Sequence, residues 1–208
     1  MNRNATILMC VLLMVSGIFF ISDKAKDTAF QNKSNSSKKI ERESPESLIS
    51  QFYNVETTMD ETHLKQFFYL SKIDTSRIKL KIKSFQVEKI KLDKIIKIEE
   101  KNSMAVLSCS YQTYFKGIKE PRPDIEVITL VNKEQSWYIV ADINEIGQLN
   151  VIDKKWQENA VLNQKKELWT NKATVNIYNS QASFDEKNKA FMEQGSKKLE
   201  QNIRERKN

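Results

Sequence analysis

The sequence is poor in the residues on which most enzyme sites depend. Its 208 residues include 1 histidine, 2 cysteines, 4 glycines and 3 prolines. No glycine-rich phosphate loop, Gly-x-Ser-x-Gly elbow or paired-cysteine cluster is present. With one histidine and carboxylates that lack ligand-like spacing, we predict no metal site and no cofactor.

The histidine and the cysteines offer little for catalysis. His63 has Asp60 and Glu61 nearby to orient it as a general base, but a polar helix residue beside acids is the favoured interpretation. Cys109 is best explained as a small buried strand residue. Cys10 lies in an apolar run, too different a setting for a disulfide with Cys109. We predict no catalytic residue and no enzymatic activity.

Charge is plentiful but not concentrated. The formal net charge is +7, and the lysines are interleaved with acidic residues along the chain. An anionic partner such as a membrane surface or a cell-wall polymer would suit this balance, although a solvated basic face is favoured. No dense patch of arginine and aromatic residues occurs, so we predict no specific nucleic-acid partner.

The longest apolar run, residues 5–22, carries no charge and follows a short basic segment, residues 1–4. Its length lies between that of a signal-peptide core and that of a spanning helix. The small-x-small cleavage motif is poor, so an uncleaved signal-anchor is favoured over a cleaved signal peptide. We predict a single-pass protein of the cell membrane that contacts the lipid bilayer through residues 5–22. The rest of the chain is expected outside the cytoplasm.

Residues 23–43 contain few large apolar side chains and predict a flexible stalk. Ser44 and Pro45 then mark the start of an amphipathic helix, and a second helix is expected from Asp60. Residues 74–84 alternate apolar residues with lysines, which fits either a strand or a short helix.

Strand patterns fill residues 85–143 and predict one curved antiparallel sheet of three or four strands, with a bulge near Glu88 and Lys89. From residue 104 to 116, alternate side chains share one face. The opposite face, which carries Val106, is either solvated or covered by residues 151–170 or by a second subunit. The residues of the first face are Ala105, Leu107, Cys109, Tyr111, Thr113 and Phe115.

Beyond residue 147 the character of the chain changes. Residues 151–170 predict a helix, the alternation at 173–177 predicts a strand, and residues 185–206 predict a charged helix with a thin apolar stripe. Such a stripe suits an exposed tail or a seam against a partner helix. We therefore assign residues 44–147 to an α+β domain and residues 148–208 to a mostly helical extension.

The order of these elements resembles the nuclear transport factor two-like family, with its cystatin-like α+β cone. The residues that carry the resemblance lie at 44–53, 64–71, 104–115 and 137–142, ending in Trp137-Tyr138-Ile139-Val140-Ala141-Asp142. The resemblance covers about residues 44–146 and implies a curved antiparallel sheet packed against two or three N-terminal helices in a cone. With the apolar run before it and the residues after it, the predicted fold class is α+β, with an N-terminal membrane helix, the cone and a C-terminal helical extension. Chains of this layout resemble the bitopic assembly component of type IV secretion and conjugation machines, and uncharacterised bacterial envelope proteins. Catalytic members place Asp/His pairs inside the cone, and this chain has no inward histidine on the sheet.

Two functions follow as expectations. The first is a membrane-anchored protein–protein contact or scaffold domain, with envelope or secretion-machine proteins or a second copy of this chain as partners. The alternative is a domain that binds or senses a small ligand in the cavity of the cone. The side chains expected to line that cavity are Phe52, Phe67, Tyr111, Phe115 and Trp137.

Overall fold

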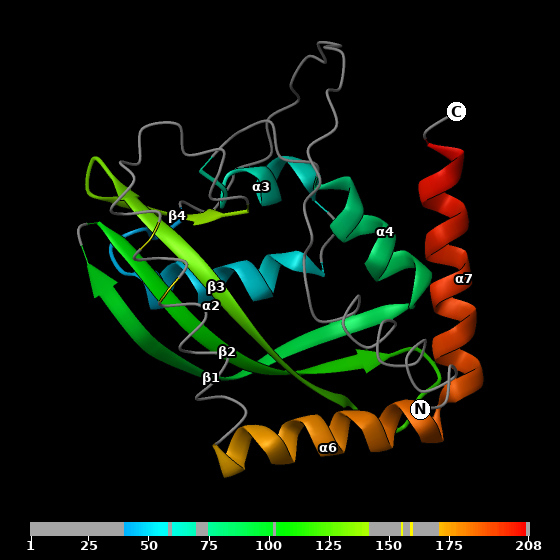
Figure 1. Ribbon diagram of the computed structural model, residues 1–208. Helices are drawn as coiled ribbons and strands as arrows, with labels where there is room; N and C mark the ends of the chain where they lie inside the picture. The colour runs from blue at the N-terminus through cyan, green and yellow to red at the C-terminus, as the bar shows by residue number, and fades with distance from the viewer. Residues whose placement is uncertain are drawn as a thin grey trace.

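A computed structural model describes residues 40–57, 60–69, 75–101, 103–141, 155, 159 and 171–206. These residues form an α+β fold in which one antiparallel sheet, with strand order β1-β2-β3-β4, is flanked by helices (Figure 1). The elements are α2 (Pro45–Glu56), α3 (Glu61–Lys65), α4 (Ser76–Ser84), β1 (Val87–Lys101), β2 (Met104–Phe115), β3 (Arg122–Lys133), β4 (Ser136–Val140), α6 (Lys172–Lys187) and α7 (Lys189–Glu205).

Side-chain caps start the first two helices: the sequence predicts the cap at Ser44, and the second helix begins at Asp60 as expected. The Ser44 hydroxyl accepts a hydrogen bond from the Ser47 amide at 3.1 Å, and the Asp60 carboxylate accepts one from the His63 amide at 3.0 Å. Helix α3 is shorter than expected and ends at Lys65. The chain leaves it because Phe67 and Ile139 share a backbone hydrogen bond of 2.8 Å, which ties this segment to β4.

Residues 76–84, which the sequence left open between strand and helix, form helix α4. Ile78 and Ile82 are buried one turn apart and join the main core. The expected bulge in β1 is present as a register shift between Val87 and Lys89. Further shifts follow along β1, and the strand bends with the sheet (Figure 1).

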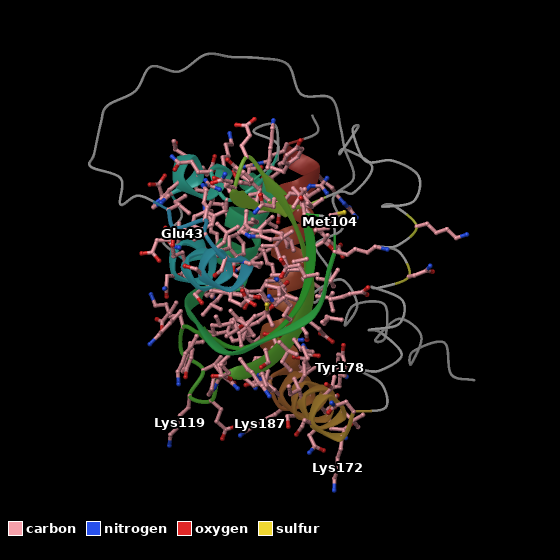
Figure 2. All side chains as sticks on the ribbon, turned by 90° about the vertical axis from the view of Figure 1, so that its left-hand side faces the viewer. Glu43, Met104, Lys119, Lys172, Tyr178 and Lys187 are labelled. Carbon is pink, nitrogen blue, oxygen red and sulfur yellow. The ribbon has the colours of Figure 1, made fainter. Side chains whose placement is uncertain are left out.

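Helices α2, α3 and α4 lie on the inner face of the curved sheet, and side chains fill the space between (Figure 2). The core there contains Phe52 of α2 and Phe67, whose ring centroids are 5.8 Å apart. Leu107 of β2 lies in the same cluster. The predicted inner face of β2 is therefore buried.

The outer face of the sheet is also covered near the start of β2. Val106, which points away from Leu107, has an exposed fraction of 0%. Met104 and Val131 form a separate small cluster there, with Tyr69, Tyr138 and Val140 packed against it. The sequence left this face either solvated or covered by another part of the structure. The burial of Val106 excludes solvation at that position.

The predicted fold class is wrong about the C-terminal helices. They pack against the sheet and α4 as part of the folded body and do not form an extension. Residues 173–177 belong to helix α6 and not to a strand. The alternation there covers only three apolar residues. The buried side chains of this segment are those of Thr174, Gln181 and Phe184, which are spaced as on one face of a helix. Phe184 packs against Phe115 of the sheet, with ring centroids 5.8 Å apart.

Helix α7 packs against the end of α4. Its Met192 joins the cluster of Phe85, Phe115 and Phe184. A Cβ atom added at Gly195 would lie 2.5 Å from the Phe85 ring, so only glycine permits this close approach. The thin apolar stripe predicted as an exposed tail or a partner seam therefore packs within the domain.

The predicted membrane anchor is not supported. Among the described residues, no helix is long and apolar enough to span a bilayer. Residues 5–22 and the helix expected at 151–170 lie outside the described residues, apart from Lys155 and Asn159. We therefore do not retain the single-pass anchor or the cell-membrane localisation drawn from it. The domain boundary expected at residue 147 lies outside the described residues and stays a prediction, although α6 and α7 beyond it pack against the sheet and α4.

The end of the predicted stalk packs against the domain. Ile40 is buried in the main core, and the Glu41 amide bonds to the Gln51 side chain at 3.0 Å. The Arg42 guanidinium lies 4.4 Å from the ring centroid of Tyr138 and donates to the Trp137 carbonyl at 3.2 Å. Residues 40–42 thus belong to the folded body.

Candidate functional site: a buried acidic cavity

The inner face of the sheet changes character along β2 and β3. Residues that face each other across antiparallel strands share a side, and here Leu107 pairs with Ile128 at the apolar end. Further along the same face the β3 positions become charged. The successive pairs there are Cys109 with Glu126, Tyr111 with Asp124, and Thr113 with Arg122.

Arg122 organises the charged end. It is 1% exposed, and its Nε and Nη2 atoms donate to the two carboxylate oxygens of Asp185 of α6 at 2.7 and 2.9 Å. Its Nη1 atom donates to Asp124, which also accepts from Thr113 Oγ1 at 2.7 Å and from Gln181 Nε2 at 2.6 Å. Burial opposes the charge of Arg122, but the hydrogen bond to Asp185 and the two carboxylates raise its pKa above the ordinary value. This network fixes α6 to β3.

A second set of polar groups lies beside this network. The Tyr53 hydroxyl of α2 donates a hydrogen bond to Glu126 Oε1. The pKa of Glu126 is raised because burial outweighs the hydrogen bond from Tyr53 and the nearby charge of Lys81. Burial also raises the pKa values of Tyr53 and Tyr111 well above their ordinary range, and the charge of Glu126 adds to both.

Glu56, the last residue of α2, differs from these groups. Its side chain is 8% exposed, and no hydrogen bond or ion pair is found between its carboxyl group and another described residue. Its oxygen atoms are not among the fully buried, unpaired side-chain atoms of the described residues, where Thr75 Oγ1 is the one found. Burial raises its pKa to about 7, with smaller contributions from Lys81, which lowers the pKa, and from Glu126 and Asp124, which raise it. Glu56 therefore titrates near neutral pH.

Glu56 lines a small, partly open cavity between α2, α4, the sheet and α7, with a volume of about 30 Å³. One water molecule needs roughly 10–15 Å³ of such space, so the cavity has room for two or three water-sized groups. Its polar wall includes Arg122 and Asp124, and its apolar wall includes Phe85 and Met192. The complete lining is Glu56, Lys81, Ile82, Phe85, Val87, Ile90, Tyr111, Thr113, Phe115, Arg122, Asp124 and Met192.

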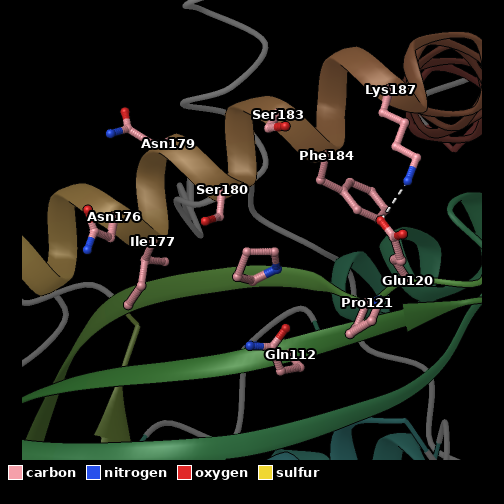
Figure 3. Close-up of a pocket in the computed structure, with 11 residues that line it drawn as sticks. Gln112, Glu120, Pro121, Asn176, Ile177, Asn179, Ser180, Ser183, Phe184 and Lys187 are labelled. Carbon is pink, nitrogen blue, oxygen red and sulfur yellow. Dashed lines mark hydrogen bonds and ion pairs between the residues drawn. The ribbon is translucent and has the colours of Figure 1, made fainter.

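A larger and more open groove runs between α6 and the outer side of β2 and β3, with a volume of about 720 Å³. Figure 3 shows Ile177 and Phe184 pointing from α6 toward the strands. The two charged side chains of its lining, Glu120 and Lys187, pair with each other at 2.8 Å. The groove has no net charge of its own to offer a ligand.

The structure separates the side chains predicted to line a cavity. Tyr111 and Phe115 line the cavity at Glu56. Phe52, Phe67 and Trp137 pack in the main apolar core instead.

His63 and Cys109 lie outside the cavity lining. His63 lies in α3, and its ring packs near the ring of Phe67 just after that helix, with centroids 5.9 Å apart. Cys109 is fully buried with its pKa raised by burial, as expected for a small core residue and not for a reactive thiol.

Sequence reasoning missed Glu56, Arg122 and Asp124, although a signal for the strand residues exists. Arg122, Asp124 and Glu126 alternate in phase with Ile128 and Leu130, so charged residues occupy inward positions of a buried strand. Glu56 follows Phe52 by one helical turn and therefore shares its buried face.

Comparison with known proteins adds little. No family model matches the chain, and no curated protein matches it. A solved structure of a SEC-C motif-containing protein from Rhodopseudomonas palustris is 14% identical, with a TM-score of 0.38, and covers 47% of this chain and 75% of its own. A likeness at this level supports no inference about this chain. No nuclear transport factor two-like protein is found, so the predicted resemblance to that family is not supported.

Proposed function

We propose that this domain binds a small ligand in the cavity at Glu56. The observation that carries the proposal is the Glu56 carboxyl group, which is 8% exposed, lines the cavity and has no hydrogen-bonding or ion-pairing partner among the described residues. A buried carboxyl group without a partner destabilises a fold. Groups of this kind, set in a cavity with a shifted pKa, are typical of functional sites.

A purely structural role accounts for part of the cluster but not for Glu56. The bonds among Arg122, Asp124 and Asp185 hold α6 against the sheet, which explains why Arg122 and Asp124 are buried beside the partly exposed Asp185. Glu56 contributes no bond to that network. Ligand binding gives its buried carboxyl group a partner.

The test is an NMR titration of the full chain with a set of small fragments, using the methyl signals of Met192 and Ile82 as reporters of the cavity. A ligand in the cavity should shift both signals in a saturable way and leave Leu130, at the apolar end of the same face, unchanged. Ser183→Ala, in the outer groove, is the matched control and should leave the binding unchanged. If no fragment shifts the cavity signals, or if every shift maps to the groove, the proposal fails.

A protein-contact role is the second candidate, and the groove beside α6 favours it. Asn176 and Asn179 line the groove, and no hydrogen bond from either side chain to another described residue is found. Free amide groups beside apolar surface suit an extended, uncharged peptide segment, because they pair with its backbone. Ile96, 48% exposed, lines an adjoining hollow that shares Ile177 with the groove.

This candidate is tested by peptide selection against the full chain. Selected peptides should be uncharged and should lose binding to an Ile177→Arg variant, while Glu56→Gln should bind them normally. Charged consensus peptides, or equal binding by both variants, would contradict it. Envelope or secretion-machine proteins as the source of the segment stay a prediction.

A further inference from the structure

We infer that the ligand of the Glu56 cavity is a small primary ammonium ion, between methylammonium and ethylammonium in size, held by the ionised carboxylate of Glu56. This inference rests on the proposed function and adds the chemical class of the ligand. Three features of the cavity carry it: the charges that face Glu56, the aromatic walls and the volume.

The charges around Glu56 leave negative charge uncompensated. Arg122 is already engaged by Asp124 and Asp185, so its charge is not free for Glu56. Lys81 lines the cavity but forms no ion pair within the described residues. The charged groups on the elements packed around the cavity are thus four carboxylates and two cations, namely Glu56, Asp124, Glu126, Asp185, Arg122 and Lys81.

The walls favour a cation over other ligands. Phe85, Phe115 and Tyr111 line the cavity, and aromatic faces attract an ammonium group. An anion would add like charge beside Asp124, and a neutral alcohol would not balance the charge of ionised Glu56. The carboxylate and the aromatic rings therefore both favour a positively charged ligand.

The volume sets the size. About 30 Å³ admits two or three heavy atoms, which is one nitrogen with one or two carbons. For ligands this small the limit on binding energy per atom places the dissociation constant at roughly 1 mM or weaker. Titrations must therefore extend to tens of millimolar.

Lys81 acts as a competitor within the chain. Its flexible side chain carries an ammonium group at the cavity wall, and its charge reaches both Glu56 and Glu126. A free amine must bind in the presence of this tethered cation. Replacing Lys81 with methionine keeps most of the stem but removes the charge, and should strengthen amine binding about threefold to tenfold.

The experiment is a titration of the full chain with ethylammonium, ethanol and acetate, read from the methyl signals of Met192 and Ile82 at several pH values. Ethylammonium should bind, with an affinity that falls about tenfold per pH unit below 7 and levels off above it, since protonated Glu56 cannot hold a cation. Glu56→Gln should lose at least tenfold and show a weaker pH dependence, since Glu126 still titrates near the cavity. Thermal unfolding of this variant establishes that it is folded.

The proposed binding cavity and the proposed class of ligand can be contradicted separately. If ethanol or acetate shifts the cavity signals and ethylammonium does not, the ligand class is wrong and the binding cavity stands. If Glu56→Gln is folded and keeps its affinity for ethylammonium, or if Lys81→Met weakens the binding, the inference is overturned. If none of the probes and no other small fragment reaches the cavity, both proposals fall.

Discussion

The two ends of the inner sheet face are built from the same strands and covered by the same helix, yet they bury opposite chemistry. At one end Leu107 and Ile128 pack beneath Phe52. At the other, one turn further along α2, Glu56 lies near Asp124. The apolar end buries hydrocarbon and stabilises the fold, whereas the polar end buries charge, which rarely does so.

This contrast indicates what each end is for. The rings of Phe52 and Phe67 meet edge to face in a well-filled core. The polar end retains a cavity, and the Glu56 carboxyl group that lines it has no hydrogen-bond or ion-pair partner among the described residues. A chain selected for stability alone would fill that end with hydrocarbon as well.

The largest effect is expected at Arg122. Arg122→Met removes the cation that Asp124 and Asp185 share, and should destabilise the fold by roughly 3–5 kcal/mol because the buried carboxylate of Asp124 and the partly buried one of Asp185 lose their partner. Urea unfolding measures the loss. Adding Asp124→Asn and Asp185→Asn to this variant should recover part of it. A triple variant less stable than Arg122→Met would show that the carboxylates are held by other groups.

At the apolar end the two faces of β2 can be compared directly. Leu107→Ala should cost roughly 2–5 kcal/mol. Val106→Ala, which removes two carbons from an equally buried site, should cost about 2 kcal/mol. Both losses should be independent of pH, as measured by urea unfolding at pH 5 and pH 8. A negligible loss at Val106 would contradict the burial of the outer face.

The pH dependence of stability separates the ends further. Because the pKa of Glu56 is about 7 in the folded chain against an ordinary 4.5, the folded state binds this proton more tightly than the unfolded state does. The fold therefore loses stability as the pH rises from about 4.5 to 7, and the loss stays constant above that range. Its size is about 3 kcal/mol at most.

Glu56→Gln lacks this titration. It should match the parent chain at pH 4.5 and exceed it in stability by up to about 3 kcal/mol at pH 8. Urea unfolding at the two pH values measures the difference. The raised pKa of Glu126 gives a pH dependence of the same sign in both proteins, and it cancels only in part because its charge also raises the pKa of Glu56. An equal difference at both pH values would refute the raised pKa.

Much of the sheet could be predicted from the sequence, because alternation is a local pattern. The inner face of β2, the β1 bulge, the cap at Ser44 and the helix start at Asp60 all follow from neighbouring residues. The packing of α6 and α7 could not be predicted. It depends on contacts such as Phe184 with Phe115 between residues 69 positions apart, and on a glycine that fits one aromatic ring.

The candidate site was predicted only in part, for a similar reason. Tyr111 and Phe115 were expected to line a cavity because aromatic residues in a curved sheet often do. Glu56 was passed over because a glutamate at a helix end is usually solvated. Its burial results from the fold of α4 and β3 around it, which no spacing along α2 reveals.

The most direct test of the central claim is an NMR measurement of the pKa of the Glu56 side-chain carboxyl group, without and with saturating ethylammonium. We expect a pKa of about 7 in the free protein and a lower value in the complex, because a bound cation favours the ionised carboxylate. A pKa near 4.5 in the free protein, or a pKa that ethylammonium leaves unchanged, would contradict the assignment of Glu56 as the ligand-binding group.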